Sequence, residues 1–449
     1  MFTRRRFIKN TGIALTASAL ISDLGRLSLA QAASDDYKAL VCIFLTGGND
    51  SNNLLIPIDI EYATYNAIRS SASGINIPQS NLLPILAPSH MGKTFGLHPA
   101  MMGFKSLYER GRAAFICNTG PLLQPINRLQ YKAGIRLPDN LFSHQDQVQL
   151  WQGALGMSTS RPSGWGGRLA EAVGPRLNIG SNFPMLMSLS GVNMFTTAQN
   201  ADVIAPGAIS LKGFNALDTK DRYDAMRALE KLDYGSSLIK AKNTLTGAAI
   251  DNMATLEALL GTQPQINTVF PSSDLGDQLK TVARMVALRD MLGLKRQVFF
   301  CSLGGFDTHS NQLSRQSALF QNLDASLLAF YNATVELGVD QRVTSFTLSD
   351  FGRTFKPTTG GGSDHGWGSH HMVVGGSVDG GNLYGKYPAL LLGGADDADD
   401  EGRWIPTTSV DEYGAQLALW FGASNLSSIF ANIDNFNASR ADLNFMRLG

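Results

Sequence analysis

Short apolar runs alternate along this chain with segments of helical period, and this alternation restricts the fold more than any other feature. Each run is continuous and rich in Val, Ile, Phe and Leu, as expected for strands that are buried on both faces. The runs cover residues 40–45, 113–117, 184–189, 298–303, 343–348, 372–374 and 389–392. The helix-period segments between them cover residues 99–109, 146–155, 313–337 and 411–421. This order predicts an α/β fold, in which a mostly parallel sheet carries helices on both faces.

The N-terminal residues predict export. The motif Thr-Arg-Arg-Arg-Phe-Ile-Lys at residues 3–9 is the pattern read by the twin-arginine translocase, which would be a partner during export. The modestly apolar residues 13–21 are too few to span a bilayer, and Ala-Gln-Ala at 30–32 offers a cleavage site for signal peptidase. We therefore interpret residues 1–32 as a signal peptide and expect a periplasmic or secreted protein. A membrane anchor or a chance basic tail is the alternative.

The remainder, residues 33–449, is expected to form a single α/β domain, because such domains with insertions reach this length. With 37 basic and 37 acidic residues and no basic block after the signal, the chain is not expected to bind nucleic acid. No later segment is long and apolar enough to predict a stable membrane span. Residues 218–294 lack strand-like runs and are rich in helix formers. We interpret them as a helical insertion or cap, with ordinary crossover helices as the alternative.

Histidines gather in polar, glycine-rich segments that follow the apolar runs or begin helices. Five of the seven follow this pattern, namely His144, His309, His365, His370 and His371. Three of the segments repeat one order, in which an apolar run leads through small residues to an aspartate: Asp50, Asp307 or Asp350. Glycines let the backbone turn sharply there, so each acid comes at the carboxyl end of a strand. Active sites of parallel sheets lie at these strand ends.

Carboxylates and imidazoles that meet at one sheet edge are suitable ligands for Zn²⁺ or Mn²⁺ and, with fewer histidines engaged, for Mg²⁺ or Ca²⁺. The predicted metal ligands are Asp50, Asp307, His309, Asp350, Asp364, His365, His370 and His371. One or two ions are expected, because two metals can stabilise both the entering and the leaving oxygen of a phosphoryl or sulfuryl transfer. Any single pair of these residues is better explained by a turn cap or a backbone contact, and only their joint occurrence favours a metal site.

The predicted catalytic residues begin with Ser143 and His144, which lie where a helix starts. A helix N-terminus lowers the cost of a developing anion, so Ser143 is a candidate nucleophile. Ser143 followed by Asp146 equally fits a helix cap, and both interpretations stay open. Arg353 and Asn49 complete the set, because a guanidinium or an amide can bind the oxygens of an oxyanion; either could instead hold a loop together.

Five stretches resemble the family named domain of unknown function 1501 (DUF1501), whose members commonly carry twin-arginine signals. They are Gly-Gly-Asn-Asp-Ser at 47–51, Phe-Ser-His at 142–144, Phe-Asp-Thr-His at 306–309, Ser-Asp-Phe-Gly-Arg-Thr at 349–354 and Asp-His-Gly-Trp-Gly-Ser-His-His at 364–371. The resemblance covers nearly all of the expected mature chain, and the last stretch is the most specific. The family in turn resembles a distant branch of the alkaline phosphatase and sulfatase superfamily. That resemblance implies a three-layer α/β/α sandwich with metals at the strand ends.

The resemblance also suggests roles by position. Asp50 resembles the superfamily's first-strand metal ligand, and Asp307 with His309 resembles its later Asp and His pair. One residue separates that pair here, where the superfamily usually has three, so a shared metal is less secure. The superfamily's Asp-His-Gly motif matches either Asp350, which is followed by Phe in place of His, or Asp364 in a glycine-rich loop, and both are retained.

Two further positions follow from the same resemblance. The final metal ligand would be His370 or His371. Ser143 matches the place of the superfamily nucleophile at a helix start. No signature for formylglycine maturation surrounds Ser143, which argues against sulfatase chemistry through that residue.

These features predict an exported metal-dependent hydrolase of phosphate or sulfate esters, which acts on a small-molecule or polymer substrate through a hydroxyl or water nucleophile. The alternative is a non-catalytic envelope protein that keeps a degenerate form of the fold for binding or scaffolding. A redox protein would also suit twin-arginine export, but the chain lacks a nucleotide-binding glycine fingerprint and a Cys-x-x-Cys motif.

Overall fold

The computed structural model describes most of the chain beyond the N-terminal segment. The described residues are 36–154, 163–205, 220–232, 235–240, 242–244, 246–247, 251–252, 265–436 and 443–448. The predicted signal peptide, residues 1–32, lies outside them. Among the described helices, none combines the length and the apolar character that a membrane crossing requires.

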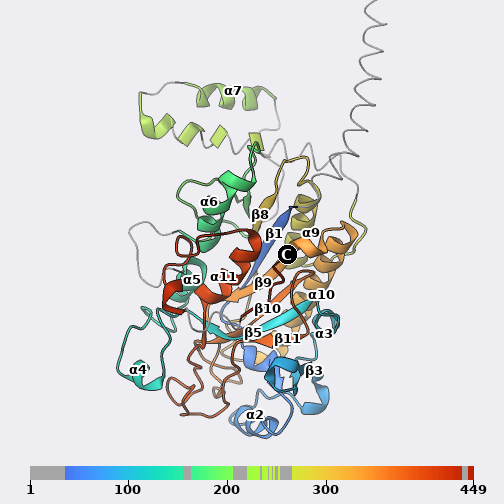
Figure 1. Cartoon of the computed structure of the whole chain (residues 1–449), viewed down its shortest axis with the longest axis vertical. Coiled ribbons are helices and arrows are strands. Elements are labelled where there is room, and N and C mark those ends of the chain that lie inside the picture. The colour runs from blue at the N-terminus through green and yellow to red at the C-terminus, as the bar shows by residue number, and fades with distance from the viewer. Residues whose placement is uncertain are drawn as a thin grey trace, which may run out of the picture.

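Within the described residues, the central sheet has nine strands in the order β11-β5-β10-β9-β1-β8-β6-β7, with β12 paired to β5. Figure 1 labels the part of this sheet from β8 to β11. The strands are β1 (Lys38–Thr46), β5 (Ala113–Gly120), β6 (Leu186–Ser188), β7 (Val203–Ile204), β8 (Arg296–Gly304), β9 (Val343–Ser349), β10 (Ser369–Gly375), β11 (Asn382–Tyr384) and β12 (Thr408–Ser409). Strand β10 runs antiparallel to β5 and β9, and the other pairings are parallel. The prediction of a mostly parallel sheet is therefore confirmed.

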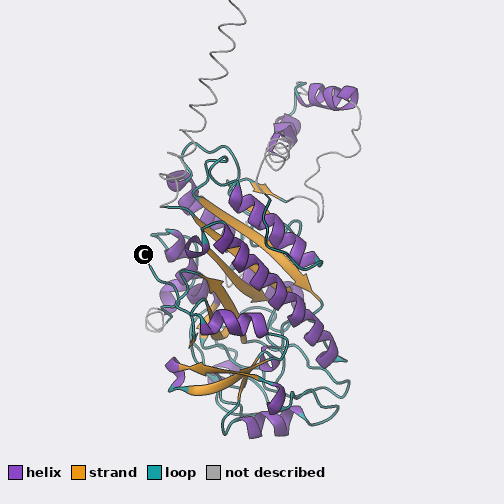
Figure 2. Ribbon diagram, turned by 90° about the vertical axis from the view of Figure 1, so that its right-hand side faces the viewer, coloured by secondary structure: helices purple, strands orange, loops and turns teal. Residues whose placement is uncertain are grey.

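Helices cover both faces of this sheet. On one face, α3 (Met102–Glu109), α9 (Asp274–Ala287) and α10 (Gln312–Glu336) contact strands β5, β8 and β10, and Figure 2 shows this side. On the other face, α5 (His144–Gly153), α6 (Trp165–Leu177) and α11 (Val410–Phe421) contact β9, β8 and β1. The chain is thus a three-layer α/β/α sandwich. The other α-helices in the described part of the chain are α2 (Tyr62–Arg69), α4 (Arg128–Lys132) and α7 (Lys220–Glu230).

A small antiparallel sheet, which the sequence patterns did not predict, packs beside one end of the sandwich. Its strands are β2 (Leu55–Pro57), β3 (Leu83–Ala87) and β4 (Lys93–Leu97), in the order β2-β4-β3. These strands are short and β3 alternates between buried and exposed positions, so they lack the continuous apolar runs that marked the main sheet. The packing of Tyr65 in α2 against Phe355 joins this sheet to the loops that follow β9.

The strand predicted at residues 389–392 is wrong, because these residues lie in a loop. The N–H of Leu391 donates to Ala389 O, and the N–H of Ala389 donates to Asp396 Oδ2, so these backbone groups are satisfied without a sheet.

In the range 218–294 the structure describes α7 and α9, and α9 packs on β8 and α10. Because much of this range lies outside the described residues, its role as an insertion or cap stays a prediction.

Replacing Asp411 by Asn is expected to remove a pH-dependent loss of stability. Asp411 is buried in the first turn of α11, and burial raises its pKa to about 7, against the opposing effects of the Asn432 N–H and Arg168. The folded state therefore holds a proton that the unfolded chain releases, so stability falls as the pH rises from about 4 to 7 and stays low above that. Between pH 5 and pH 8 the wild type should lose on the order of 2 kcal/mol relative to Asp411→Asn in denaturant unfolding. Equal pH dependence in the two proteins would contradict this assignment.

Candidate metal centre

The loops that follow β1, β8 and β9 leave the sheet side by side. In the parallel register, Thr46 of β1 pairs with Gly304 of β8, and Leu45 pairs with Ser349 of β9, so the three strands end at one level. The turn after β1 approaches the turn after β8 closely: a Cβ on Gly47, whose φ is +115°, would lie 2.4 Å from Asp307 N. Only glycine fits that conformation and that space. This close approach brings Asp307 to the strand ends.

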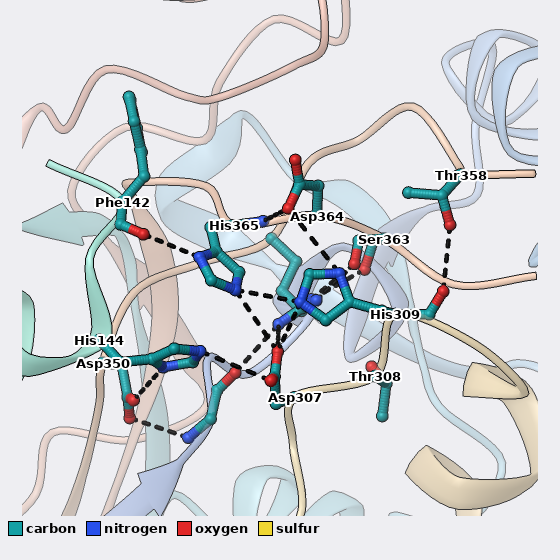
Figure 3. Close-up of polar contacts among 12 residues, drawn as sticks. Phe142, His144, Asp307, Thr308, His309, Asp350, Thr358, Ser363, Asp364 and His365 are labelled. Carbon is teal, nitrogen blue, oxygen red and sulfur yellow. Dashed lines mark hydrogen bonds and ion pairs between the residues drawn. The ribbon is translucent and has the colours of Figure 1, made fainter. Parts of the chain in front are cut away.

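Three imidazoles from three separate segments point toward the carboxylate of Asp307 (Figure 3). His309 Nε2 lies 2.9 Å and His365 Nε2 3.5 Å from Asp307 Oδ1, and His144 Nε2 lies 3.6 Å from Oδ2. The Nε2 atoms of His309 and His365 are 3.1 Å apart. Asp307 and His309 follow β8, His144 begins α5, and His365 lies in the loop before β10. We call these four residues the Asp307 cluster.

The Nδ1 atom of each imidazole, on the side of the ring away from Asp307, faces an oxygen that can accept a hydrogen bond. His365 Nδ1 lies 2.7 Å from the backbone oxygen of Phe142, which can only accept, so this nitrogen carries the ring proton of a neutral His365. His144 Nδ1 lies 2.7 Å from Asp350 Oδ2, and His309 Nδ1 lies 3.8 Å from Asp364 Oδ1. A carboxylate or carbonyl at Nδ1 is the arrangement that turns the Nε2 lone pair of a histidine toward a metal.

The spacing of these atoms fits a single divalent ion. Tetrahedral ligands at the usual Zn–N and Zn–O lengths are about 3.3 Å apart, close to the separations in the Asp307 cluster. Two groups of three side chains each bring their potential ligand atoms within 4.8 Å of one another. One group is His144, Asp307 and His365, and the other is His309, Asp364 and His365. Because Nδ1 of His365 is held by Phe142 O, only its Nε2 is open, and the two groups therefore meet at this one atom. A donor set rich in imidazole suits Zn²⁺ or Mn²⁺ better than Mg²⁺ or Ca²⁺.

The electrostatics keep these side chains in the forms that bind cations. Burial tends to raise the pKa of Asp307, but the hydrogen bond and charge of Arg353 and the neighbouring imidazoles outweigh it and lower the pKa. Burial, with the charges of His144 and Arg353, lowers the pKa of His365. At neutral pH, Asp307 is therefore an anion and His365 a neutral imidazole.

Arg353 is almost fully buried, and all of its nitrogens are used. Nη1 donates to Asp307 Oδ1 at 2.9 Å and to Gly47 O at 3.0 Å, while Nε and Nη2 donate to Ser363. The side chain thus ties together the loops after β1, β8 and β9 and orients Asp307. Of the two roles open for Arg353, the geometry favours holding the loops over binding a substrate oxyanion.

Asp350 and Asp364 both lie beside the Asp307 cluster, each at the Nδ1 side of one imidazole. Asp350 is buried, which raises its pKa, and it also accepts the N–H of Gly47 at 2.9 Å. Asp364 is about half exposed and pairs with Arg403 at 3.0 Å. The two aspartates thus have different surroundings: Asp350 contacts His144 from the buried side, and Asp364 offers a carboxylate on the open side.

The structure does not bring Asp50 into the cluster. Its buried carboxylate pairs with the guanidinium of Arg69 in α2, and it also accepts hydrogen bonds from Gln312 and from Asn52 Nδ2 at 3.0 Å. A cation there would have to displace a buried guanidinium, so we leave Asp50 out of the ligand set. Asn49 donates its backbone N–H to Ser349 Oγ, and its buried side-chain amide has no partner among the described residues.

His370 and His371 lie inside β10, away from the cluster. His370 Nδ1 accepts the N–H of Asn118 at 3.0 Å, and the ring of His371 packs 4.6 Å from that of Trp151. Burial lowers the pKa of each to about 3, so both are neutral core side chains. The predicted strand began only at residue 372, whereas β10 begins at Ser369, and this difference takes both histidines into the sheet.

Ser143 is the N-cap residue of α5, but its side chain accepts no backbone N–H within the described part of the chain. Its Oγ instead donates to Asp146 Oδ2 at 2.7 Å. The preceding residue, Phe142, has φ +72°, an uncommon conformation for a residue with a side chain, and its carbonyl accepts from His365. The carbonyl of this residue therefore contacts the Asp307 cluster, and Ser143 Oγ donates to a carboxylate that can accept its proton.

Sequence reasoning assigned His144 to catalysis and missed its place beside Asp307. It also missed Arg69, which neutralises Asp50, and the Phe142 carbonyl. Local sequence held no signal for either contact, because Arg69 comes from the unpredicted small sheet region and any residue can offer a carbonyl.

We expect Asp350→Asn to weaken metal binding by about 10- to 100-fold, the usual cost of losing the carboxylate behind a metal-bound histidine. The new amide can donate to His144 Nδ1, which would shift the ring proton to Nε2 and block its lone pair. Titration of the purified protein with Zn²⁺ measures the change. Asp324→Asn is the matched control, because Asp324 is also a buried aspartate that accepts backbone N–H groups, here those of Gly103 and Phe104. Unchanged affinity in Asp350→Asn would contradict the assignment of His144 as a ligand.

Comparison with known proteins gives one family and several distant structures. The family model described as "Protein of unknown function (DUF1501)" matches residues 37–398. No curated protein matches the chain.

Three solved structures align with TM-scores of 0.35 or lower. The crystal structure of Ps i-CgsB is 10% identical, covers 89% of this chain and 77% of its own, and has a TM-score of 0.35. The lipoteichoic acid synthase LtaP from Listeria monocytogenes is 7% identical, covers 83% and 74%, and scores 0.31. The PsFucS1 sulfatase from Pseudoalteromonas sp. is 8% identical, covers 82% and 68%, and also scores 0.31. At scores this low, the site has to be interpreted from its own geometry.

Proposed function

We propose that this chain, which belongs to the DUF1501 family, is an exported hydrolase of phosphate or sulfate esters that works with one divalent cation. Asp307, His144, His309 and His365 would hold the cation. The observation that carries the proposal is the convergence of three imidazole Nε2 atoms on one carboxylate, with acceptors facing the far nitrogens of His144 and His365.

A bound cation would act as a Lewis acid, polarising an ester oxygen and lowering the pKa of a water or hydroxyl beside it. The chain's own residues supply the rest. Arg353 fixes Asp307, Asp350 fixes His144, and Phe142 O fixes His365. Asp146 accepts the hydrogen of Ser143 Oγ, so it can take the proton as the hydroxyl attacks the central atom of the ester and the ester oxygen leaves as the alcohol. Water then releases the transferred group from Ser143. His144 begins the same helix, which ties the nucleophile to the cation site.

The open side of the site supports a small-molecule or polymer ester as substrate. The side chains of Asp307, His309 and Asp364 are each exposed by nearly half, at 46%, 47% and 48%. A phosphoryl or sulfuryl group can therefore reach the cluster without the whole substrate entering the protein.

Metal analysis and an ester panel test the proposal. The protein is purified after export, without added ions and without a metal-binding tag, and its metal content is measured by mass spectrometry. Aryl phosphate monoesters, phosphate diesters and aryl sulfates are then assayed with the protein as isolated, after chelation, and after addition of Zn²⁺, Mn²⁺, Mg²⁺ or Ca²⁺. We expect about one ion per chain and turnover that chelation abolishes and one of these ions restores. No bound ion, and no turnover with any of them, would refute the proposal.

A second candidate, a non-catalytic envelope protein for binding or scaffolding, has one observation in its favour. Asp50, the counterpart of a superfamily metal ligand, is neutralised by Arg69, and Phe351 follows Asp350 where the superfamily motif has His. A second metal of the superfamily type is therefore disfavoured here. Stoichiometric metal binding without turnover of any ester would support this candidate.

Export by the twin-arginine route is a separate proposal, because the motif at residues 3–9 lies outside the described residues. Replacing Arg4 and Arg5 together by Lys is expected to stop export, because the translocase reads the arginine pair. Cell fractionation with the native promoter measures the result, and the change of Arg6 to Lys, which leaves the pair intact, is the control. Normal export of the double variant would argue against this route.

A further inference from the structure

The guanidinium of Arg403 lies against both segments that meet at the ring of His365. Its Nε donates to the backbone oxygen of His365 at 2.7 Å, and its Nη2 donates to Asp364 Oδ2 at 3.0 Å. Its central carbon lies 5.0 Å from the centroid of the Phe142 ring. Phe142 in turn offers the backbone oxygen that faces His365 Nδ1 (Figure 3). One side chain thus contacts both residues of this hydrogen bond.

Arg403 is itself held by a loop that is built around a buried carboxylate, and we call residues 393–403 the Asp397 loop. Asp397 is fully buried. Its two oxygens accept four backbone N–H groups, those of Gly393, Asp399, Gly402 and Arg403. A buried polar network whose members are all satisfied is rigid. The backbone end of the Arg403 side chain is therefore fixed in place.

The contacts of Arg403 depend on the shape of a guanidinium. Each of its three nitrogens donates to a different residue, namely His365, Asp364 and Asp399. Because a guanidinium is planar, its donors have fixed directions, and the acceptors that it holds are fixed relative to one another. Its face attracts the aromatic ring of Phe142. A lysine at this position would keep the charge and lose the plane.

We propose that Arg403 is a positioning residue, which holds the imidazole of His365 with its proton on Nδ1 and its Nε2 toward Asp307. It fixes the backbone oxygen of His365 on one side and the ring of Phe142 on the other, so that Phe142 O stays within reach of Nδ1. Phe142 needs such support, because its φ of +72° is uncommon for a residue with a side chain. The use of this orientation, to bind a divalent cation, rests on the proposed function, whereas the orientation itself is measurable without an ion.

NMR of ¹⁵N-labelled histidine in the exported chain, after chelation, tests this role. Burial lowers the pKa of His365, so above neutral pH its ring is neutral, and we expect one tautomer with the proton on Nδ1. The signals of this ring are those that disappear in His365→Gln. In Arg403→Met, which keeps the stem of the side chain and removes the guanidinium, we expect the two tautomers to mix. Zn²⁺ affinity should also fall about 10- to 100-fold, the usual effect of losing a group that orients a metal ligand.

Arg128→Met is the matched control, because Arg128 holds the same Asp397 loop and its side chain is exposed to a similar degree, 15% against 17% for Arg403. Arg128 donates to Gly394 O at 3.0 Å and to Asp399 O at 2.7 Å. Both variants should lower the midpoint of thermal unfolding, but only Arg403→Met should mix the tautomers of His365. The same mixing in Arg128→Met would overturn the proposal, since any loosening of the loop would then suffice.

Arg403→Lys separates charge from shape, and it decides the question if Arg403→Met does not fold. An ammonium group cannot hold three acceptors in one plane, so we expect the tautomers to mix here as well. A single Nδ1 tautomer in either folded variant of Arg403 would overturn the proposal. If the tautomers mix as expected while the wild type binds no metal, the proposed function fails and the role of Arg403 in orienting His365 stands.

Discussion

Asp307→Ala should leave the protein folded but without the cation that we propose, and we expect turnover of any ester substrate to fall about a thousandfold. All three Nε2 atoms approach the carboxylate of Asp307, so its removal takes both a ligand and negative charge that would offset the cation. Arg353 would keep its bonds to Gly47 and Ser363, so the loops should stay joined. Metal content by mass spectrometry and kcat/KM measure the two effects.

Asp307→Asn separates charge from packing in the same experiment. Its amide oxygen can still accept from Arg353, but it cannot neutralise a cation. Asp379→Ala is the matched control, because Asp379 is exposed to a similar extent and pairs with Arg447 at 3.1 Å, outside the cluster. Full metal content and turnover in Asp307→Asn would exclude the Asp307 cluster as the metal site.

The second large effect is expected at Ser143. In Ser143→Ala the metal should remain, because none of the cluster's ligand atoms belongs to Ser143, while kcat should fall about a thousandfold or more if its hydroxyl attacks the ester. The hydroxyl already donates to Asp146 and caps no backbone group within the described chain, so little stability should be lost. Rapid-mixing kinetics should show no burst in the variant, and mass spectrometry should find a phosphorylated Ser143 only in the wild type.

Ser273→Ala provides the control for a simple helix cap. Ser273 is the N-cap of α9 and does accept a backbone N–H, that of Gly276 at 3.1 Å. Its replacement should cost about 1 kcal/mol of stability and leave kcat unchanged. If Ser143→Ala behaves in the same way, with full turnover, Ser143 is a cap and water is the nucleophile.

The main sheet could be predicted because its strands are buried on both faces. β1, β8 and β9 appear as continuous apolar runs at residues 40–45, 298–303 and 343–348, and the structure has strands in each place. The small sheet could not be found in this way. Its strands are short, one of them alternates in burial, and such segments resemble loops in a single sequence.

The candidate site was predictable in part for the same reason. Asp307 and His309 follow a recognisable strand, so their place at the sheet edge followed from the strand itself. Asp50 follows an equally clear strand, yet its carboxylate is taken by Arg69 from α2, and nothing local to either residue signals that pairing. His370 and His371 were misplaced because β10 starts three residues before its apolar run.

The sequence by itself determined which segments become buried strands and which acids and imidazoles stand just beyond them, because burial on both faces requires continuous apolar residues. Only the tertiary structure decided which of those side chains face one another. Contacts such as those of His144 with Asp350, His365 with Phe142, and Asp50 with Arg69 join segments far apart in the chain or in different elements. They depend on the packing of helices and loops over the strand ends, which no local pattern of residues encodes.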